Sequence, residues 1–151
     1  MSDINQLILE SLNPIYDISR VKHLNLLIKL GIPKTEIILC GSALLVCAGK
    51  VETNRDIDIC VSTKYFKSKI LNNPNFYPAF SETINNKIYT LYRNKDDTID
   101  VCDYHISLQK TFNELKKDTI NIDGWMLQSP KSSLEFYKIM NRPKDQSIIK
   151  I

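Results

Sequence analysis

Aspartates alternate with aliphatic residues at one point of the chain, in Asp56-Ile57-Asp58-Ile59. Because successive side chains of a strand point to opposite faces, this alternation predicts a strand over residues 55–62 whose two carboxylates share one face. The aliphatic side chains would then face a core on the other side. A helix would place the same residues around its circumference, so the segment restricts the fold to one that contains a sheet.

A third aspartate, Asp100, stands between two aliphatic residues in a second predicted strand, 98–104, which follows a hairpin turn at 94–97. Asp103, its rival as the third carboxylate, would lie on the opposite face. Carboxylates among strand aliphatics destabilise a fold unless a cation pairs with them. No histidine or cysteine lies at zinc-ligand spacing from them. The three aspartates therefore predict a magnesium or manganese site, because hard cations prefer oxygen ligands.

Gly41-Ser42 lies between a predicted strand, 36–40, and a small apolar segment, 43–48, that favours a buried helix. A glycine at such a turn lets the backbone approach a ligand closely. Amides at the start of a helix face an anion, and the Ser42 hydroxyl can donate a hydrogen bond as well. This turn is therefore a candidate phosphate cradle, which complements the cation site.

Helices and strands are predicted along the rest of the chain. Periodicity and turn signals predict helices at 5–12, 17–30, 43–48, 65–71, 107–117 and from 130 onward, and strands at 36–40, 55–62, 87–92, 98–104, 120–122 and 125–128. We expect an α/β fold in which a small, mixed, twisted sheet carries the carboxylates and helices pack on its other face. A single domain, 1–151, would hold N-terminal helices in 1–31, the sheet in 36–128 and a helical segment in 130–151.

Composition limits the alternatives. The 151 residues suffice for one globular domain that folds without disulfides, and the four cysteines are expected to be buried free thiols. A net charge of +3 argues weakly against a long nucleic-acid footprint. The start of the chain lacks the pattern of a signal peptide, and no apolar run has the length of a membrane-spanning helix. We expect a cytoplasmic protein without a membrane partner.

The spacing of these motifs resembles the DNA polymerase beta-like nucleotidyltransferase superfamily, in particular its minimal bacterial and phage-type domains. The resemblance covers residues 36–151. The domains that it points to include antibiotic adenylyltransferases and abortive-infection-type toxins. It rests on Gly41-Ser42, then thirteen residues, then Asp56-Ile57-Asp58, and on the later Asp100. A closing segment, 123–146, with Arg142-Pro143-Lys144-Asp145 is similar as well, although it lacks the acidic residue that relatives often carry before their last isoleucine.

The resemblance implies a nucleotidyltransferase that moves a nucleoside monophosphate from a nucleoside triphosphate to a hydroxyl acceptor and releases pyrophosphate. Gly41 and Ser42 would hold the triphosphate tail. Asp56 and Asp58 would bind two Mg²⁺ or Mn²⁺ ions, and Asp100 would bind one and help deprotonate the acceptor. The basic residues of the closing segment are candidates for neutralising the polyphosphate, with a solvated helix face as the alternative: Lys138, Arg142 and Lys144.

Several alternatives stay open at this point. The acceptor could be a small molecule, a protein or an RNA end, and a toxin-like enzyme acting on tRNA or protein is one alternative. A protein partner could supply the acceptor site, because relatives commonly append a helical domain or partner there. A nucleotidyltransferase-like module that binds nucleotide or a partner without catalysis is the alternative from another class. His105, Arg55 and Trp125 are expected to have structural roles.

Overall fold

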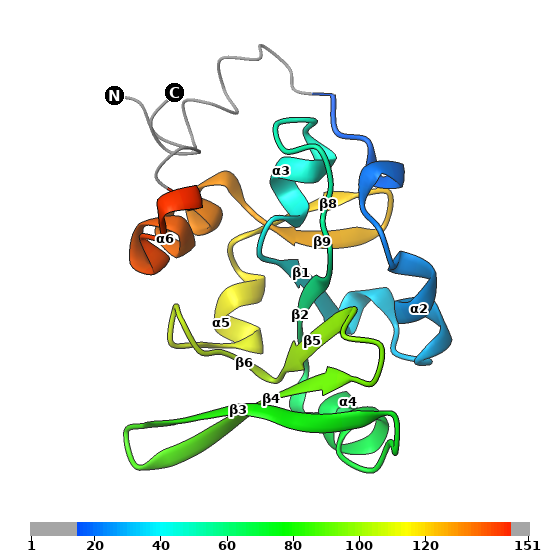
Figure 1. The fold of residues 1–151 in the computed structure, drawn as a ribbon, viewed down its shortest axis with the longest axis vertical. Coiled ribbons are helices and arrows are strands. Elements are labelled where there is room, and N and C mark those ends of the chain that lie inside the picture. Colours follow the sequence, from blue (N-terminus) through cyan, green and yellow to red (C-terminus); the bar gives the residue numbers. More distant parts are fainter. Residues whose placement is uncertain (1–14, 146–151) are drawn as a thin grey trace.

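A seven-stranded mixed sheet forms the centre of the computed structural model, which describes residues 15–145 (Figure 1). The strand order is β3-β4-β5-β2-β1-β9-β8. The pairs β2/β5 and β1/β9 are parallel, and the other neighbours are antiparallel. The predicted mixed α/β architecture is confirmed. The strands are β1 Ile37–Cys40, β2 Ile57–Val61, β3 Phe76–Ile84, β4 Lys87–Asn94, β5 Ile99–Cys102, β8 Thr119–Ile122 and β9 Trp125–Gln128.

Short helices surround this sheet, and a small hairpin, β6 Tyr104–His105 with β7 Lys110–Thr111, lies beside it. None of the helices between residues 15 and 145 has the length and apolar character needed to cross a bilayer. The helical segments are η1 Ile18–Arg20, α2 Leu24–Lys29, η2 Lys34–Glu36, α3 Ala43–Cys47, α4 Thr63–Tyr65, η3 Phe66–Ile70, α5 Phe112–Lys116 and α6 Pro130–Met140.

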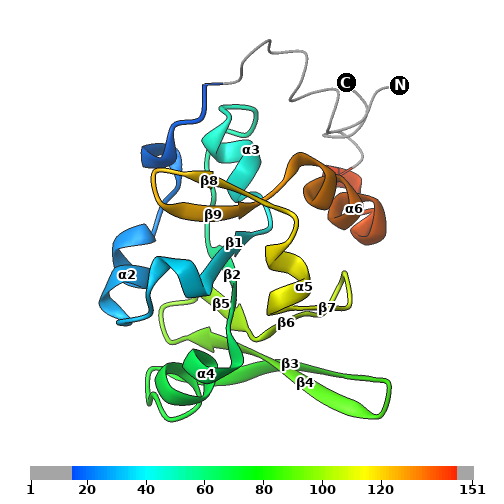
Figure 2. The ribbon, with the colours of Figure 1, turned by 180° about the vertical axis from the view of Figure 1, so that it is seen from behind.

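The two faces of the sheet are buried by different elements. Leu39 and Ile59 belong to the main core together with residues of α2, α3 and η3. On the other face, Ile38 and Cys60 pack against Phe112 of α5. The two ribbon views agree that α2 and α5 lie on opposite sides of the central strands (Figures 1 and 2). The expectation that helices pack on one face only is therefore wrong for α5.

The helix predicted over residues 17–30 is broken into η1 and α2, and the one predicted at 5–12 lies outside the described residues. Asn54 causes the break. Its side-chain oxygen accepts a hydrogen bond from Lys22 N (2.9 Å) and its amide donates to Lys22 O (3.2 Å). Because these backbone groups are engaged by Asn54, the helix does not continue through them, and His23 adopts a left-handed conformation (φ 77°).

The predicted helix at 107–117 is corrected, and one strand was not predicted. The helix expected at 107–117 begins only at Phe112, because Thr111 and Glu114 form a reciprocal capping box. The preceding residues form the β6–β7 hairpin instead. Strand β3 had no predicted counterpart. It contains Pro78 beside an irregular register, which is tolerated because β3 is an edge strand.

Candidate active site

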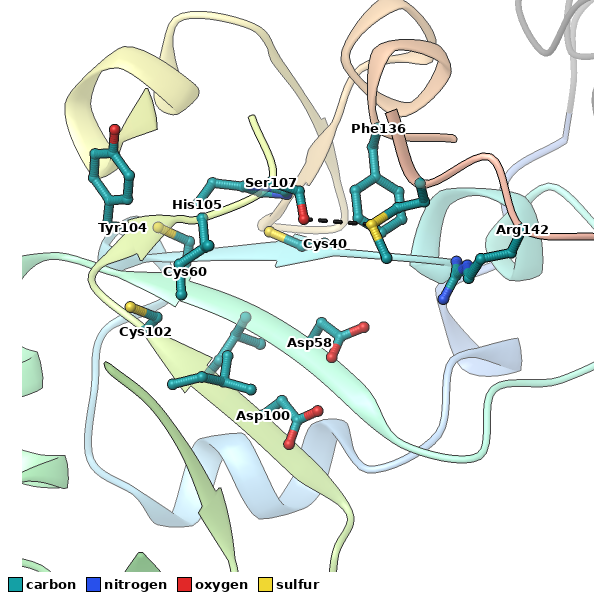
Figure 3. Close-up of a pocket in the computed structure, with 15 residues that line it drawn as sticks. Cys40, Asp58, Cys60, Asp100, Cys102, Tyr104, His105, Ser107, Phe136 and Arg142 are labelled. Atoms are coloured by element: carbon teal, nitrogen blue, oxygen red, sulfur yellow. Dashed lines mark hydrogen bonds between the residues drawn. The ribbon is translucent and has the colours of Figure 1, made fainter. Parts of the chain in front are cut away.

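The predicted aspartates come together at two neighbouring parallel strands. Asp58 of β2 and Asp100 of β5 are register partners, and the close-up shows their carboxylates near each other (Figure 3). Asp56 immediately precedes β2. All three line one cavity of about 540 Å³, which we call the polar cavity. The structure thus brings together carboxylates that are separated by more than forty positions in the sequence.

Burial and the neighbouring carboxylates shift the pKa of Asp58. Burial, and then the charges of Asp56 and Asp100, raise the pKa of Asp58 to about 7, and Arg142 offsets part of this increase. Desolvated like charges at close range favour protonation of one of them. The same repulsion would favour a bound cation, since a divalent ion removes it without adding a proton.

Gly41 brings the β1–α3 turn against Asp58. Its φ of +63° is left-handed, and a Cβ at this position would collide with Asp58 Oδ2. Ser42 follows at the start of α3, where its side chain makes no capping hydrogen bond. Both residues line the polar cavity. Glycine at position 41 therefore allows the candidate phosphate turn and the carboxylates to be in direct contact.

Arg142 and Lys144 also line the polar cavity, but Lys138 does not, because it lies on the exposed side of α6. Arg142 is held by Asp145, to which Nε and Nη2 donate hydrogen bonds of 2.6 and 2.9 Å. The side chain of Asp145 is fully buried. Of the three predicted phosphate-neutralising residues, the structure places two beside the carboxylates.

Asn54 and Arg93 are further site residues. Besides holding Lys22, Asn54 donates a hydrogen bond to Asp56 O (3.1 Å), which fixes the backbone that precedes β2. Arg93 of β4 is the register partner of Asp100. Its Nε donates to Asp100 Oδ1 (2.6 Å) and its Nη2 to Oδ2 (3.1 Å). Sequence reasoning missed the role of Arg93, although the predicted hairpin contained the signal: residues that flank a tight turn face each other.

A second cavity, of about 260 Å³, adjoins the polar cavity along the same face (Figure 3). We call it the apolar cavity. It shares Gly41, Asp58, Asp100, Phe136 and Arg142 with the polar cavity, and Cys60 and Cys102 follow the aspartates at two-residue spacing. His105 lines it as well, and its Nδ1 accepts a hydrogen bond from Leu108 N (3.1 Å). The other apolar walls come from β1, β4, β6 and α6: Cys40, Leu91, Tyr104, Phe136 and Met140.

The donor set fits magnesium or manganese in its chemistry. Carboxylates are the protein ligands that these ions prefer, and a backbone turn and two basic residues for a phosphate lie beside them. Within residues 15–145, however, no group of three His, Cys, Asp or Glu side chains is arranged so that it could hold a metal ion. The carboxylate of Asp100 is already paired with a cation, the guanidinium of Arg93. Mg²⁺ commonly takes only one or two protein carboxylates and completes its shell with waters and phosphates.

Comparison of the chain with protein-family models, with curated proteins and with solved structures found no match in any of the three. The resemblance to polymerase beta-like nucleotidyltransferases therefore stays a prediction. What bears on it is the geometry of its motif residues, namely the contact between Gly41 and Asp58 and the pairing of Asp58 with Asp100.

Proposed function

We propose that this protein is a metal-dependent nucleotidyltransferase that moves a nucleoside monophosphate from a nucleoside triphosphate to a hydroxyl acceptor. One observation carries the proposal: the Gly41 turn lies directly against Asp58, which is itself the register partner of Asp100. A phosphate cradle and a carboxylate group that serve one reaction must reach the same phosphate, and the proximity of Gly41 to Asp58 supports this proposal.

Different residues along the sheet would bind the triphosphate, hold the metal ions and accept the proton. Gly41, Ser42, Arg142 and Lys144 would bind the triphosphate tail in the polar cavity. Asp56, Asp58 and Asp100 would hold two Mg²⁺ or Mn²⁺ ions, which stabilise charge on the attacking and leaving oxygens. Asp100 would accept the proton of the acceptor hydroxyl as its oxygen bonds to the α-phosphorus. The bond to the bridging oxygen breaks, and pyrophosphate leaves with that electron pair.

A second candidate function is nucleotide or partner binding without catalysis. The ion pair between Arg93 and Asp100 favours it, because a bound guanidinium neutralises the carboxylate that would otherwise serve as metal ligand and base. In this alternative Arg93 replaces the second cation permanently. In the catalytic alternative Asp100 exchanges Arg93 for a metal ion when nucleotide binds.

One experiment distinguishes between the two candidate functions. Thermal unfolding and pyrophosphate release are measured with each of the four nucleoside triphosphates and Mg²⁺ or Mn²⁺. The samples are the wild type, an Asp56→Asn/Asp58→Asn variant and an Asp96→Asn control, which removes a single carboxylate at an exposed turn. Ligand that binds only the folded state raises the unfolding temperature by mass action.

The transferase proposal expects metal-dependent stabilisation by at least one triphosphate in the wild type and the control, with loss in the double variant. Pyrophosphate release should follow the same pattern. Stabilisation without pyrophosphate release, unchanged by the double substitution, would favour the binding module. Absence of triphosphate binding in all three proteins would refute the transferase and nucleotide binding, and would leave partner binding without catalysis.

A further inference from the structure

We propose that the apolar cavity receives the acceptor, and that the acceptor is a small uncharged molecule whose hydroxyl is carried by an apolar, aromatic body. This inference rests on the proposed nucleotidyl transfer and narrows it. It chooses a small molecule over an RNA end or a protein as the hydroxyl donor.

The order of strands sets the direction of attack. Gly41 follows β1, Asp58 belongs to β2 and Asp100 to β5, and β2 lies between the other two strands. A phosphoryl-group displacement is in line, so the attacking oxygen enters opposite the leaving group. If pyrophosphate leaves on the Gly41 side, the acceptor must enter from the β5 side. The apolar cavity extends to that side, where Leu91, Cys102 and Tyr104 form its wall.

The chemistry of the walls selects an uncharged ligand. Cys60 and Cys102 are buried free cysteines, and a buried free cysteine behaves as a small apolar side chain. Burial lowers the pKa of His105 to about 4, so its imidazole is neutral at physiological pH. Among the described lining residues, Arg142 is the only one with a positive charge, and it stands where the two cavities meet. Away from Asp58, Asp100 and Arg142, a charged body would lose its hydration against these walls without gaining a partner.

Aromatic side chains favour an aromatic body. Phe136 and Tyr104 line the cavity from α6 and β6, and the rings of Tyr104 and Tyr89 are stacked at 3.8 Å. Such walls give an aromatic ring offset-stacked or edge-to-face contacts. The hydroxyl would point to Asp100 and Asp58, which are polar groups at the open junction with the polar cavity.

The size of the cavity favours a small molecule over a polymer. Its volume of about 260 Å³ is below the usual range of about 300–1,000 Å³ for ligand pockets, which limits the occupant to a small molecule. An RNA end would need a basic groove beside the cavity to hold its backbone phosphates. The apolar wall formed by β4, β5 and β6 offers cysteine, leucine and tyrosine side chains instead.

The test measures two ligands on one set of variants. Binding of benzyl alcohol and 2-phenylethanol is followed by saturation-transfer NMR, with benzoate and glycerol as the charged and the fully polar comparison. Binding of Mg²⁺ with an α,β-methylene nucleoside triphosphate, which cannot transfer, is followed by thermal unfolding. Cys102→Phe fills the cavity from β5. Leu91→Phe fills it from the half-buried β4 position, where overpacking is milder, and Ile88→Phe is the exposed control.

We expect the alcohols to bind the wild type and Ile88→Phe, and to bind at least about tenfold more weakly to either filled variant, with nucleotide binding unchanged. Benzoate and glycerol should not compete. Equal alcohol binding by wild type and filled variants would overturn the assignment. So would loss of nucleotide binding in the filled variants, because the cavity would then hold the nucleobase. Alcohol binding by a wild type that binds no triphosphate would refute the proposed transfer while leaving an apolar ligand site.

Discussion

Arg93 and Asp100 face each other across the β4–β5 pair and form a two-point ion pair, with distances of 2.6 and 3.1 Å. The carboxylate is almost fully buried, whereas the guanidinium remains partly exposed. A forked donor of this kind fixes the orientation of a carboxylate as well as its charge. Arg93 therefore acts on the site through Asp100, as a positioning residue.

Replacing Arg93 by alanine should destabilise the metal-free protein by about 1–3 kcal/mol, because Asp100 would lose its partner while remaining buried beside Asp58. Mg²⁺ should restore more stability to this variant than to the wild type. Urea unfolding with and without Mg²⁺ measures both effects. Arg93→Lys should recover part of the stability and little of the orientation. An Arg93→Ala protein as stable as the wild type would show that the pair contributes nothing.

Gly41→Ala should abolish triphosphate binding, because the new Cβ would displace the Asp58 carboxylate and strain a left-handed backbone. Gly124→Ala is the matched control. It has the same kind of backbone (φ +85°), but its Cβ would meet only the Lys34 side chain, at an ordinary 3.7 Å. Gly124→Ala should cost about 1–2 kcal/mol of stability, and Gly41→Ala should cost more because it also displaces Asp58. Only Gly41→Ala should remove the nucleotide-dependent rise in unfolding temperature. Equal binding by both variants would contradict the contact.

Asn54→Asp tests the link between the N-terminal segment and Asp56. The aspartate keeps the acceptor for Lys22 N but loses the donations to Lys22 O and Asp56 O. We expect a loss of about 1–3 kcal/mol in the free energy of unfolding. Metal-dependent nucleotide binding should weaken beyond what that loss explains, since the backbone of Asp56 is released. Asn73→Asp, in the loop before β3, keeps the oxygen that accepts from Asn75 N (2.9 Å) and should change neither quantity.

His105 predicts a pH dependence. Its pKa is about 4 in the folded protein because of burial, against about 6.5 in an unfolded chain. The unfolded state therefore binds more protons between these values. The contribution of His105 to stability is complete above pH 6.5 and falls by about 3 kcal/mol as the pH drops to 4. Protonation at Nδ1 would also remove the acceptor for Leu108 N.

The measurement compares unfolding free energies of the wild type and His105→Asn across pH 4 to 7. Asparagine offers an oxygen near the position of Nδ1 and does not titrate. Groups common to both proteins cancel in the difference. We expect the wild type to lose stability relative to the variant as the pH falls, and parallel curves would show that His105 titrates normally.

Local patterns predicted the central part of the molecule. The alternation around Asp58 and the turn at Gly41 identified β1, β2, α3 and their contact region, because buried strands show their period in the sequence. The elements that were missed depend on partners distant in the chain. Strand β3 has no clean alternation, because it is an edge strand with exposed residues on both faces. The break before α2 depends on Asn54, thirty-two positions from Lys22.

The unpaired edge of β3 has a consequence for self-association. An open edge strand offers its backbone amides and carbonyls to any other extended chain, and exposed Phe80 would add an apolar contact. Pro78 provides no amide hydrogen, and the register shift between Pro78 and Phe80 bends the ladder at the same point. An incoming strand could therefore pair with only part of β3. The proline and the register shift therefore disfavour fibre-like stacking of copies of the protein along β3.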